Sequence, residues 1–358
     1  LALCAACAAS SPRPASVRVI ESKERAPDWT RATKDGSVIS RELLTAVELG
    51  YPDISYDGKY YSMIRPGEGA LYVGRIGAQP QPLLFTILDY QWIGEHSLIY
   101  RGDDGWYRAD AADEAFTKIE KKKIAAIEGK ESYSSFRKHS RIMNVSPDGN
   151  RVIIAMVGKD EKLSPWRYDV RTGAFTELIH NTRYDEVFVD ENDRPAFAVE
   201  RNERGGDLKV HERLERGWVE RTIDLPKETI SIVEVRRGEV TLAVGSEQEP
   251  RYVLWNASTN AVKDWLPRGA SRVVYDAADE KPLVGRYGRT WRAVDRAYEN
   301  IAAQLDALAI ETVNARTDRF WTAIAKVGDD EAYYAIDVMR GEIRELGLHR
   351  DRKHAAAP

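Results

Sequence analysis

The chain has 358 residues, enough for one large domain or two of modest size. Lys and Arg total 53 against 57 Asp and Glu, so the formal net charge is −4, and the concentrated basic surface of a nucleic-acid-binding protein is excluded. The 9 Trp and 17 Tyr against only 7 Phe favour a β-rich protein, because an amphipathic ring suits a strand with one end in water.

An apolar stretch of small residues opens the chain at residues 1–9, and a Ser-Pro-Arg-Pro run follows it. This composition is typical of the end of a secretory signal, so we expect residues 1–16 to be a leader and the protein to be exported to the periplasm or cell envelope. Cys7, preceded by two alanines, resembles the acylated cysteine of a bacterial lipobox, although Cys4 stands where that motif prefers leucine. Two outcomes stay open: a lipid anchor at Cys7, which would make the protein a lipoprotein, or plain cleavage after a small residue.

Both cysteines of the chain lie in this leader. Once the leader is removed, the protein would have neither a disulfide nor a thiolate metal site. Residues 17–45 are polar and irregular, which favours a leader segment or a closing strand over a separate domain. Elsewhere in the sequence no stretch approaches the roughly 20 apolar residues of a membrane-spanning helix.

From residue 46 to 350 the sequence alternates short strand patterns with turns. Asp57-Gly58 precedes the strand pattern Lys59–Ile64, and Ser146–Asn150 precedes the strand pattern Arg151–Val157. Asp-Gly is a strong signal for a tight turn because glycine accepts a positive φ. The alternation predicts one β-rich domain over residues 46–350.

A unit of strand, polar corner and second strand recurs three times, at Arg167–Gly173, Tyr252–Asn260 and Tyr333–Gly341. Successive copies lie 86 and 82 residues apart (Tyr168 to Leu254 and Leu254 to Ile336), and the two Asp-Gly turns lie 91 residues apart; each spacing is about twice the ~40–45 residues of a four-stranded propeller blade. The spacing predicts an all-β fold, a β-propeller of about seven blades, in which each small sheet is buried against its neighbours. Between Val294 and Leu308 apolar residues fall three and four apart, which predicts a short helical insertion before the last blade.

Six stretches carry a family pattern: Pro52–Lys59, Val145–Gly149, Tyr168–Gly173, Tyr298–Leu308, Thr317–Trp321 and Asp330–Asp337. Together they resemble the N-terminal propeller of prolyl oligopeptidase-type serine peptidases, which include dipeptidyl and acylaminoacyl peptidases. The resemblance covers about 300 residues and implies that an α/β-hydrolase domain begins just after the propeller. Residues 351–358 would then be a truncated linker to that domain.

No Gly-x-Ser-x-Gly sequence occurs in the chain, so the strained turn that exposes a catalytic serine is absent, and no catalytic residue is predicted. The resemblance implies a non-catalytic propeller that gates the access of short peptides to a hydrolase domain. The chain would be truncated before that domain or encoded apart from it, so the two could act in cis or in trans. No cofactor is expected. The alternatives are a free-standing binding or scaffold propeller of the cell envelope, and a propeller enzyme with its own metal or carboxylate site.

The six histidines form no metal-binding pair such as His-Glu-x-x-His, so no metal site is predicted. Arg286, Arg289 and Arg292 surround Trp291, and we predict these four residues as a ligand or channel site. Guanidinium groups can clamp a carboxylate, and an aromatic ring can line a channel. The Lys121–Lys123 run lies among glutamates, and we interpret it as a solvated loop.

Overall fold

The computed structural model describes residues 18–19, 50–65, 70–78, 80–84, 89–102, 104–111, 119–127, 140–201, 208–225, 230–236, 238–245, 250–266, 269–276, 281–327 and 330–349. The chain divides into two compact units: unit 1 comprises Leu1–Ile54 and Ser271–Pro358, and unit 2 comprises Ser55–Ala270. The expected leader at residues 1–16, with Cys7, and the expected linker at residues 351–358 lie outside the described residues, as does the segment 17–45 apart from Arg18 and Val19.

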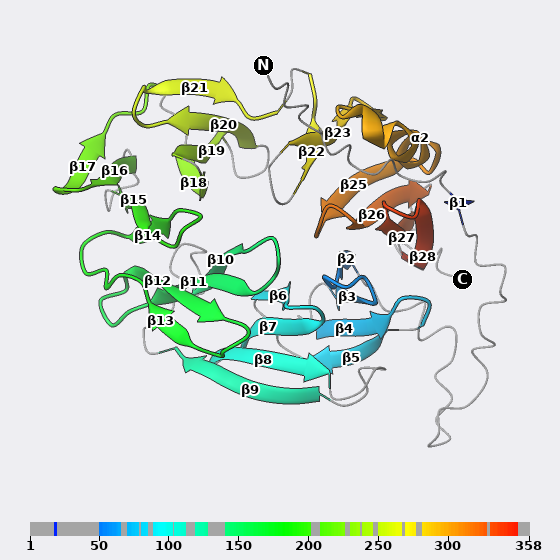
Figure 1. Cartoon of the computed structure of the whole chain (residues 1–358), viewed down its shortest axis with the longest axis horizontal. Helices are drawn as coiled ribbons and strands as arrows, with labels where there is room; N and C mark the ends of the chain where they lie inside the picture. Colours follow the sequence, from blue (N-terminus) through cyan, green and yellow to red (C-terminus); the bar gives the residue numbers. More distant parts are fainter. Residues whose placement is uncertain are drawn as a thin grey trace, which may run out of the picture. The chain divides into compact units, whose positions relative to one another are not determined.

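Unit 2 is a succession of small, mainly antiparallel sheets (Figure 1). Its first sheet contains β3 (Tyr60–Arg65), β4 (Ala70–Arg75) and β5 (Gln81–Leu84). The second contains β6 (Asp89–Ile93), β7 (Ser97–Gly102), β8 (Gly105–Ala111) and β9 (Ile119–Ala126). The last contains β18 (Ile230–Arg236), β19 (Glu239–Gly245), β20 (Pro250–Asn256) and β21 (Ala261–Asp264).

Between these lies an eight-stranded sheet that consists of two groups of four strands. The first group is β10 (Arg141–Val145), β11 (Arg151–Val157), β12 (Leu163–Asp169) and β13 (Phe175–Glu177). The second group is β14 (Glu186–Val189), β15 (Pro195–Arg201), β16 (Leu208–Leu214) and β17 (Gly217–Arg221). One parallel bridge, between Leu163 and Glu186, joins the two groups. In Figure 1 the strands β9, β13, β17 and β21 lie along one side of unit 2, and the first strands β6, β10 and β18 lie along the opposite side.

Unit 1 contains a three-stranded and a five-stranded sheet. The three strands are β22 (Arg272–Tyr275), β23 (Pro282–Tyr287) and β24 (Thr290–Ala293). The five are β25 (Ile310–Ala315), β26 (Phe320–Val327), β27 (Asp330–Asp337), β28 (Glu342–His349) and β1 (Arg18–Val19). Strand β1 is parallel to β28 and pairs Arg18 with Glu342. A further strand, β2 (Gly50–Ile54), reaches β26 through a 2.8 Å hydrogen bond from the Thr322 hydroxyl to the Pro52 carbonyl oxygen.

The prediction of an all-β chain built from propeller-type sheets, with one short helix before the last sheet, is confirmed for the described residues. The helix is α2 (Glu299–Ala307), and one turn of 3₁₀-helix, η2 (Arg296–Tyr298), precedes it. The described strands form six hydrogen-bonded sheets, since β10–β17 are connected into one.

Helix α2 takes the place of a fourth strand beside β24. Its apolar face, formed by Ile301, Ala302 and Leu305, is buried in the core of unit 1. The Trp291 N–H lies on the edge of β24 away from β23 and donates to the Asp306 carboxylate of the helix at 3.2 Å. The helix therefore covers a sheet edge that would otherwise present an unpaired N–H group.

Hydrophobic side chains of successive sheets share each main core cluster. In unit 2, Leu71 of the first sheet packs with Trp92 of the second, and Trp106 of the second packs with Ile154 of the next. In unit 1, Trp291 and Trp321 belong to one cluster that also contains α2. Four tryptophans are fully buried in this way: Trp92, Trp106, Trp255 and Trp321. This packing gives each small sheet the buried face that it cannot provide alone.

Two predicted turns, Ser55–Lys59 and Ser146–Asn150, have the same hydrogen bonds. In each, the serine hydroxyl donates to the aspartate two residues later, at 2.7 and 2.5 Å, and accepts the N–H five residues later at 3.0 Å. Gly58 and Gly149 have φ values of +67° and +71°. The Asp-Gly turns are therefore as predicted, and the glycines supply the left-handed conformation.

The three predicted corners also share one geometry. Asp169, Asn256 and Asp337 each accept the backbone N–H three residues later, at 2.8, 3.0 and 3.1 Å. The residue four positions on has a positive φ in every case: 71° at Gly173, 55° at Asn260 and 63° at Gly341. A short polar side chain that caps its own turn, followed by glycine or asparagine, is the physical basis of the sequence repeat.

The Lys121–Lys123 run is part of strand β9, so its interpretation as a loop is wrong, although its side chains are exposed as expected. The three consecutive lysines lie on β9, which is the edge strand of its sheet. Lysines on an outer strand oppose the pairing of that edge with another chain. The lysine run therefore protects the edge of this sheet from pairing with another chain.

We expect Gly149→Ala to lower the free energy of unfolding by about 2–3 kcal/mol, from the left-handed backbone and from overpacking. A Cβ atom there would lie 2.8 Å from the Tyr56 ring and 3.0 Å from the Gly94 nitrogen. Gly77→Ala is the matched control, because Gly77 has a φ of +89° with no atom within 4 Å of the added Cβ. Urea unfolding of both variants checks this, and equal losses would show that the packing contact contributes nothing.

Candidate functional site

The predicted ligand site divides into buried and exposed residues. Trp291 is 3% exposed and donates from Nε1 to the Ile310 carbonyl oxygen at 2.6 Å, so it is a core residue of unit 1. Arg286, directly opposite on β23, is half-buried and donates from Nη1 to the Glu311 carbonyl oxygen at 3.1 Å. The hairpin therefore brings Arg286 and Trp291 together, with both side chains engaged by the chain itself.

The other two residues of the prediction lie apart from that pair. Arg289 is exposed in the two-residue turn between β23 and β24. Arg292 is also exposed, and its guanidinium lies over the Tyr287 ring, 5.5 Å from the ring centroid. Because successive strand residues face opposite sides of a sheet, Arg292 and Trp291 project from opposite faces of β24.

A row of buried and half-buried charges in unit 2 was not predicted from the sequence. It comprises Asp89 on β6, Arg101 on β7, Arg141 on β10 and Glu186 on β14, and we call it the first-strand charge row because three of the four lie on first strands. Asp89 Oδ2 accepts the Ile142 N–H at 2.9 Å, which connects β6 to β10. Arg141 forms an ion pair with Glu186, which connects β10 to β14. Arg101 is 5% and Glu186 8% exposed.

Within the charge row, the pKa of Asp89 is shifted by opposing effects. Burial raises the pKa of Asp89 above its ordinary value, although hydrogen bonds from the Ile142 and Tyr90 N–H groups and the charges of Arg101 and Arg141 act in the opposite direction. Buried ion pairs rarely stabilise a fold more than apolar residues of the same size would. A buried charged cluster with a perturbed pKa is therefore a candidate functional site.

We expect the stability of the wild-type protein to fall, relative to Asp89→Asn, as the pH rises. The raised pKa means that folded Asp89 binds a proton at a pH where the unfolded chain has lost it. The contribution of Asp89 to the free energy of unfolding is thus fully present below the ordinary pKa of an aspartate. It is lost as the pH rises through the pKa of Asp89 in the folded protein. Urea midpoints of both proteins between pH 3.5 and 6 measure the difference, about the range in which carboxylates titrate. A difference of opposite slope would mean that the two arginines dominate.

Unit 1 contains a second buried pair, between Asp53 of β2 and Arg316. Arg316 Nε lies 3.3 Å from Asp53 Oδ1, and its Nη2 forms an ion pair with Oδ2. Asn314 Nδ2 donates to the same carboxylate at 3.5 Å. Both charged side chains are buried, with exposed fractions of 8% for Arg316 and 10% for Asp53. The pair holds β2 against the loop that follows β25.

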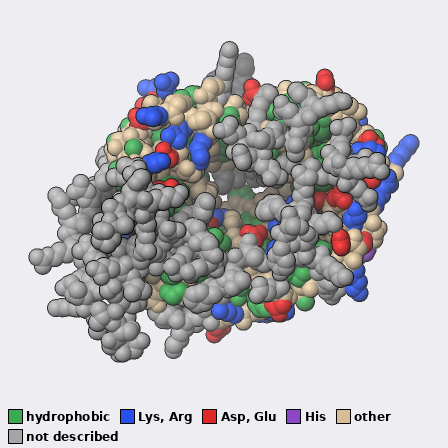
Figure 2. Space-filling model, turned by 180° about the vertical axis from the view of Figure 1, so that it is seen from behind, with side chains coloured by type: hydrophobic (Ala, Val, Ile, Leu, Met, Phe, Trp, Pro, Cys, Tyr) green, Lys and Arg blue, Asp and Glu red, His purple; other side chains and the backbone are tan. Residues whose placement is uncertain are grey.

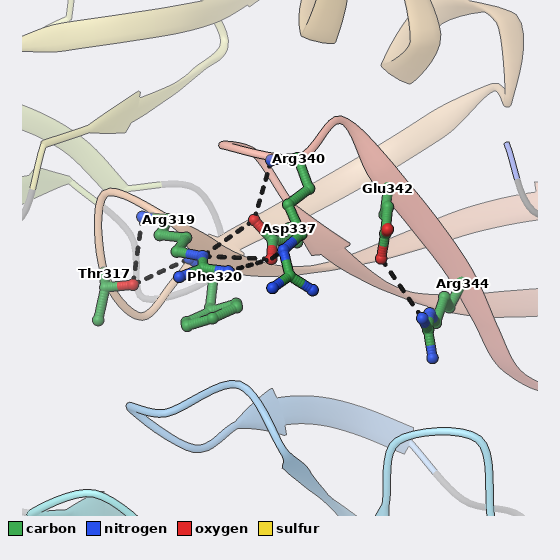
Figure 3. A network of polar contacts seen from close by, with 7 residues as sticks. All are labelled: Thr317, Arg319, Phe320, Asp337, Arg340, Glu342 and Arg344. Carbon is green, nitrogen blue, oxygen red and sulfur yellow. Dashed lines mark hydrogen bonds and ion pairs between the residues drawn. The ribbon is translucent and has the colours of Figure 1, made fainter. Parts of the chain in front are cut away.

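One end of the last sheet carries a surface cluster of arginines, which we call the arginine corner: Arg319, Arg340 and Arg344. Figure 3 shows Asp337 between Arg319 and Arg340, and Glu342 beside Arg344. Arg319 donates to Asp337 from Nε at 3.1 Å and from Nη2 at 2.7 Å, and this raises its pKa.

The described residues show neither a metal-binding cluster nor a membrane-spanning helix. They contain no group of three or more His, Cys, Asp or Glu side chains that could hold a metal ion. None of the helices in this part of the chain is long and apolar enough to cross a membrane. Figure 2 shows acidic and basic side chains interspersed over the visible described surface, in line with the near-zero net charge.

No family model and no curated protein matches the chain. Among solved structures it is similar to a puromycin-hydrolyzing peptidase from Mycobacterium tuberculosis, with 14% identity and a TM-score of 0.49 over 86% of this chain and 54% of that one. It is also similar to the β-propeller domain of the Trilobed protease from Pyrococcus furiosus, with 12% identity and a TM-score of 0.39 over 87% and 84%. A third is an oligogalacturonate lyase from Vibrio parahaemolyticus, with 11% identity and a TM-score of 0.44 over 82% and 92%.

The chain spans about half the length of the puromycin-hydrolyzing peptidase. Two of these three structures are a peptidase and the propeller domain of a protease. The third is a lyase, so these likenesses assign no activity to the chain.

Proposed function

We propose that this chain is the non-catalytic propeller domain of a prolyl-oligopeptidase-like serine peptidase, and that it gates the access of short peptides to an α/β-hydrolase domain. The sequence motifs and the succession of small sheets with matching turns support this proposal. The eight-stranded sheet counts as two blades, because a single bridge joins its halves. Counted together with the two sheets of unit 1, the proposed propeller would have about seven blades.

The first-strand charge row is the observation that carries the gating role. Blades of a propeller surround a central channel, which their first strands line. Asp89, Arg141 and Glu186 would then place fixed charges of both signs along the channel wall. Such a wall can interact with the two charged ends of a short peptide, while the ring excludes a folded protein by size.

The first test is the coding sequence that follows the Pro358 codon. An in-frame or neighbouring domain with Gly-x-Ser-x-Gly supports the proposal, and unrelated genes after a stop codon contradict it. The joined protein then permits a kinetic test. Arg141→Ala/Glu186→Ala should change the relative kcat/KM for charged and capped peptides of equal length, and leave the hydrolysis of a small ester unchanged. The matched control is Glu212→Ala/Arg221→Ala, which removes an ion pair between β16 and β17 outside the charge row.

A free-standing binding or scaffold propeller of the cell envelope is the second candidate. Strand β1 supports it, because residues from near the N-terminus already cover part of the outer edge of β28. This candidate predicts that the protein, acylated at Cys7, is found in the membrane fraction without a hydrolase partner. Mass spectrometry of the N-terminal peptide and of cross-linked partners tests both parts.

A further inference from the structure

We propose that the arginine corner is a membrane-facing surface that binds the phosphate groups of anionic lipids. The inference rests on the proposed location in the cell envelope, and it does not depend on the gating role. Its two supports are the exposure of the arginines and the path of the chain toward the N-terminus.

The arginines project into solvent, and the carboxylates that pair with them are largely covered. The exposed side-chain fractions are 65% for Arg340, 46% for Arg344 and 38% for Arg319. Those of their partners are 13% for Asp337 and 28% for Glu342. Asp318, in the same loop, and Glu345, which follows Arg344 and faces the other side of the sheet, are exposed carboxylates of this region. Anions that approach the corner therefore meet guanidinium groups first, which suit phosphate because they donate two parallel hydrogen bonds.

The corner side of the last sheet is also where the N-terminal segment reaches the fold. Strand β1 pairs Arg18 with Glu342 and Val19 with Ile343, at the first residues of β28. Ten residues separate Cys7 from Arg18 in the sequence. Even fully extended, they span about 40 Å. An anchor in the apolar stretch 1–9, by acylation or by insertion, would hold this corner close to the bilayer surface.

Such a surface would act together with the anchor. A single acyl chain gives only marginal membrane binding, and a basic surface is a common second signal. Each Lys or Arg near an anionic surface contributes about a fivefold gain in affinity at moderate salt. Two exposed arginines at the corner would thus contribute about 25-fold.

The test is the co-sedimentation of the full chain, carrying Cys7→Ser, with phosphatidylcholine vesicles and with mixed phosphatidylcholine–phosphatidylglycerol vesicles. The protein with an unchanged corner should bind the mixed vesicles more tightly than the phosphatidylcholine vesicles, and added salt should weaken this binding. Arg340→Glu/Arg344→Glu should reduce that binding at least about 25-fold. Lys121→Glu/Lys122→Glu makes the same change in charge on exposed residues of β9 and should leave it unchanged.

Every other result overturns the proposal. Equal binding of the starting protein to both vesicle types would leave no role for anionic lipid. Equal losses in the two charge-reversed variants would mean that overall charge, and not the corner, drives binding. Retained binding after Arg340→Glu/Arg344→Glu would remove the corner from consideration, leaving an acidic protein partner as the next hypothesis. Circular dichroism of both variants confirms that they are folded, and a failed gating assay leaves these outcomes unaffected.

Discussion

Trp321→Ala is expected to lower the free energy of unfolding by about 3–5 kcal/mol, the range for removal of a buried aromatic side chain. Trp321 is fully buried in the cluster that joins the two sheets of unit 1 to α2. Its ring stacks on Tyr298 with centroids 5.9 Å apart and planes 7° from parallel. Its Nε1 donates to the Thr317 carbonyl oxygen at 3.0 Å, so the substitution also removes a hydrogen bond.

The control for this variant is Trp265→Ala in unit 2. Trp265 is half-buried and meets Tyr252 edge to face at 5.6 Å, so we expect a loss of about 1 kcal/mol. Urea unfolding followed by far-UV circular dichroism measures both variants without relying on tryptophan fluorescence. Equal losses at the two positions would contradict the assignment of Trp321 to the centre of the core.

Asp53→Ala is expected to cost about 3–5 kcal/mol, because it removes the carboxylate that pairs with Arg316 and keeps that guanidinium buried. Both side chains are at most 10% exposed, so water reaches the guanidinium poorly after the substitution. The loss should be visible as a lower urea midpoint at neutral pH.

The double variant Asp53→Leu/Arg316→Met separates the value of the pair from the cost of an unpaired charge. Replacing both partners by apolar side chains of similar size is often close to neutral, so we expect the double variant to recover most of the loss. If the double variant were as unstable as Asp53→Ala, the geometry of this ion pair, and not charge burial, would set the stability.

Local features of the fold could be predicted from the sequence because they depend on neighbouring residues. The strand Arg151–Val157 begins and ends where its apolar pattern does, directly after the Asp148-Gly149 turn. The helix follows its three-and-four spacing, and Ile301 and Leu305 are buried as expected. The Lys121–Lys123 run was misjudged, because charge suggested a loop, whereas the strand results from pairing with β8.

The candidate site could not be predicted in the same way. Asp89, Arg141 and Glu186 are separated by about 50 residues in the sequence, and only the succession of sheets brings them together. A weak signal existed: Arg101 is the one charged residue in the strand Ser97–Gly102, which includes the apolar run Leu98–Ile99. Closeness in the sequence also does not ensure closeness of side chains, because Arg286 and Arg292 lie in one hairpin and project in different directions.

The discontinuous path of unit 1 has a consequence for synthesis on the ribosome. Unit 2 is one continuous segment, so its sheets can form in turn as Ser55–Ala270 emerges. The Asp53–Arg316 pair joins residues 263 positions apart, and β1 must await the last strand of the chain. Contacts of such separation are slow to form, because the entropy of closing a long loop must be overcome first. The β1–β28 pairing and the Asp53–Arg316 ion pair therefore cannot form until unit 2 and most of unit 1 have been synthesised, which is the period when a chaperone would be most needed.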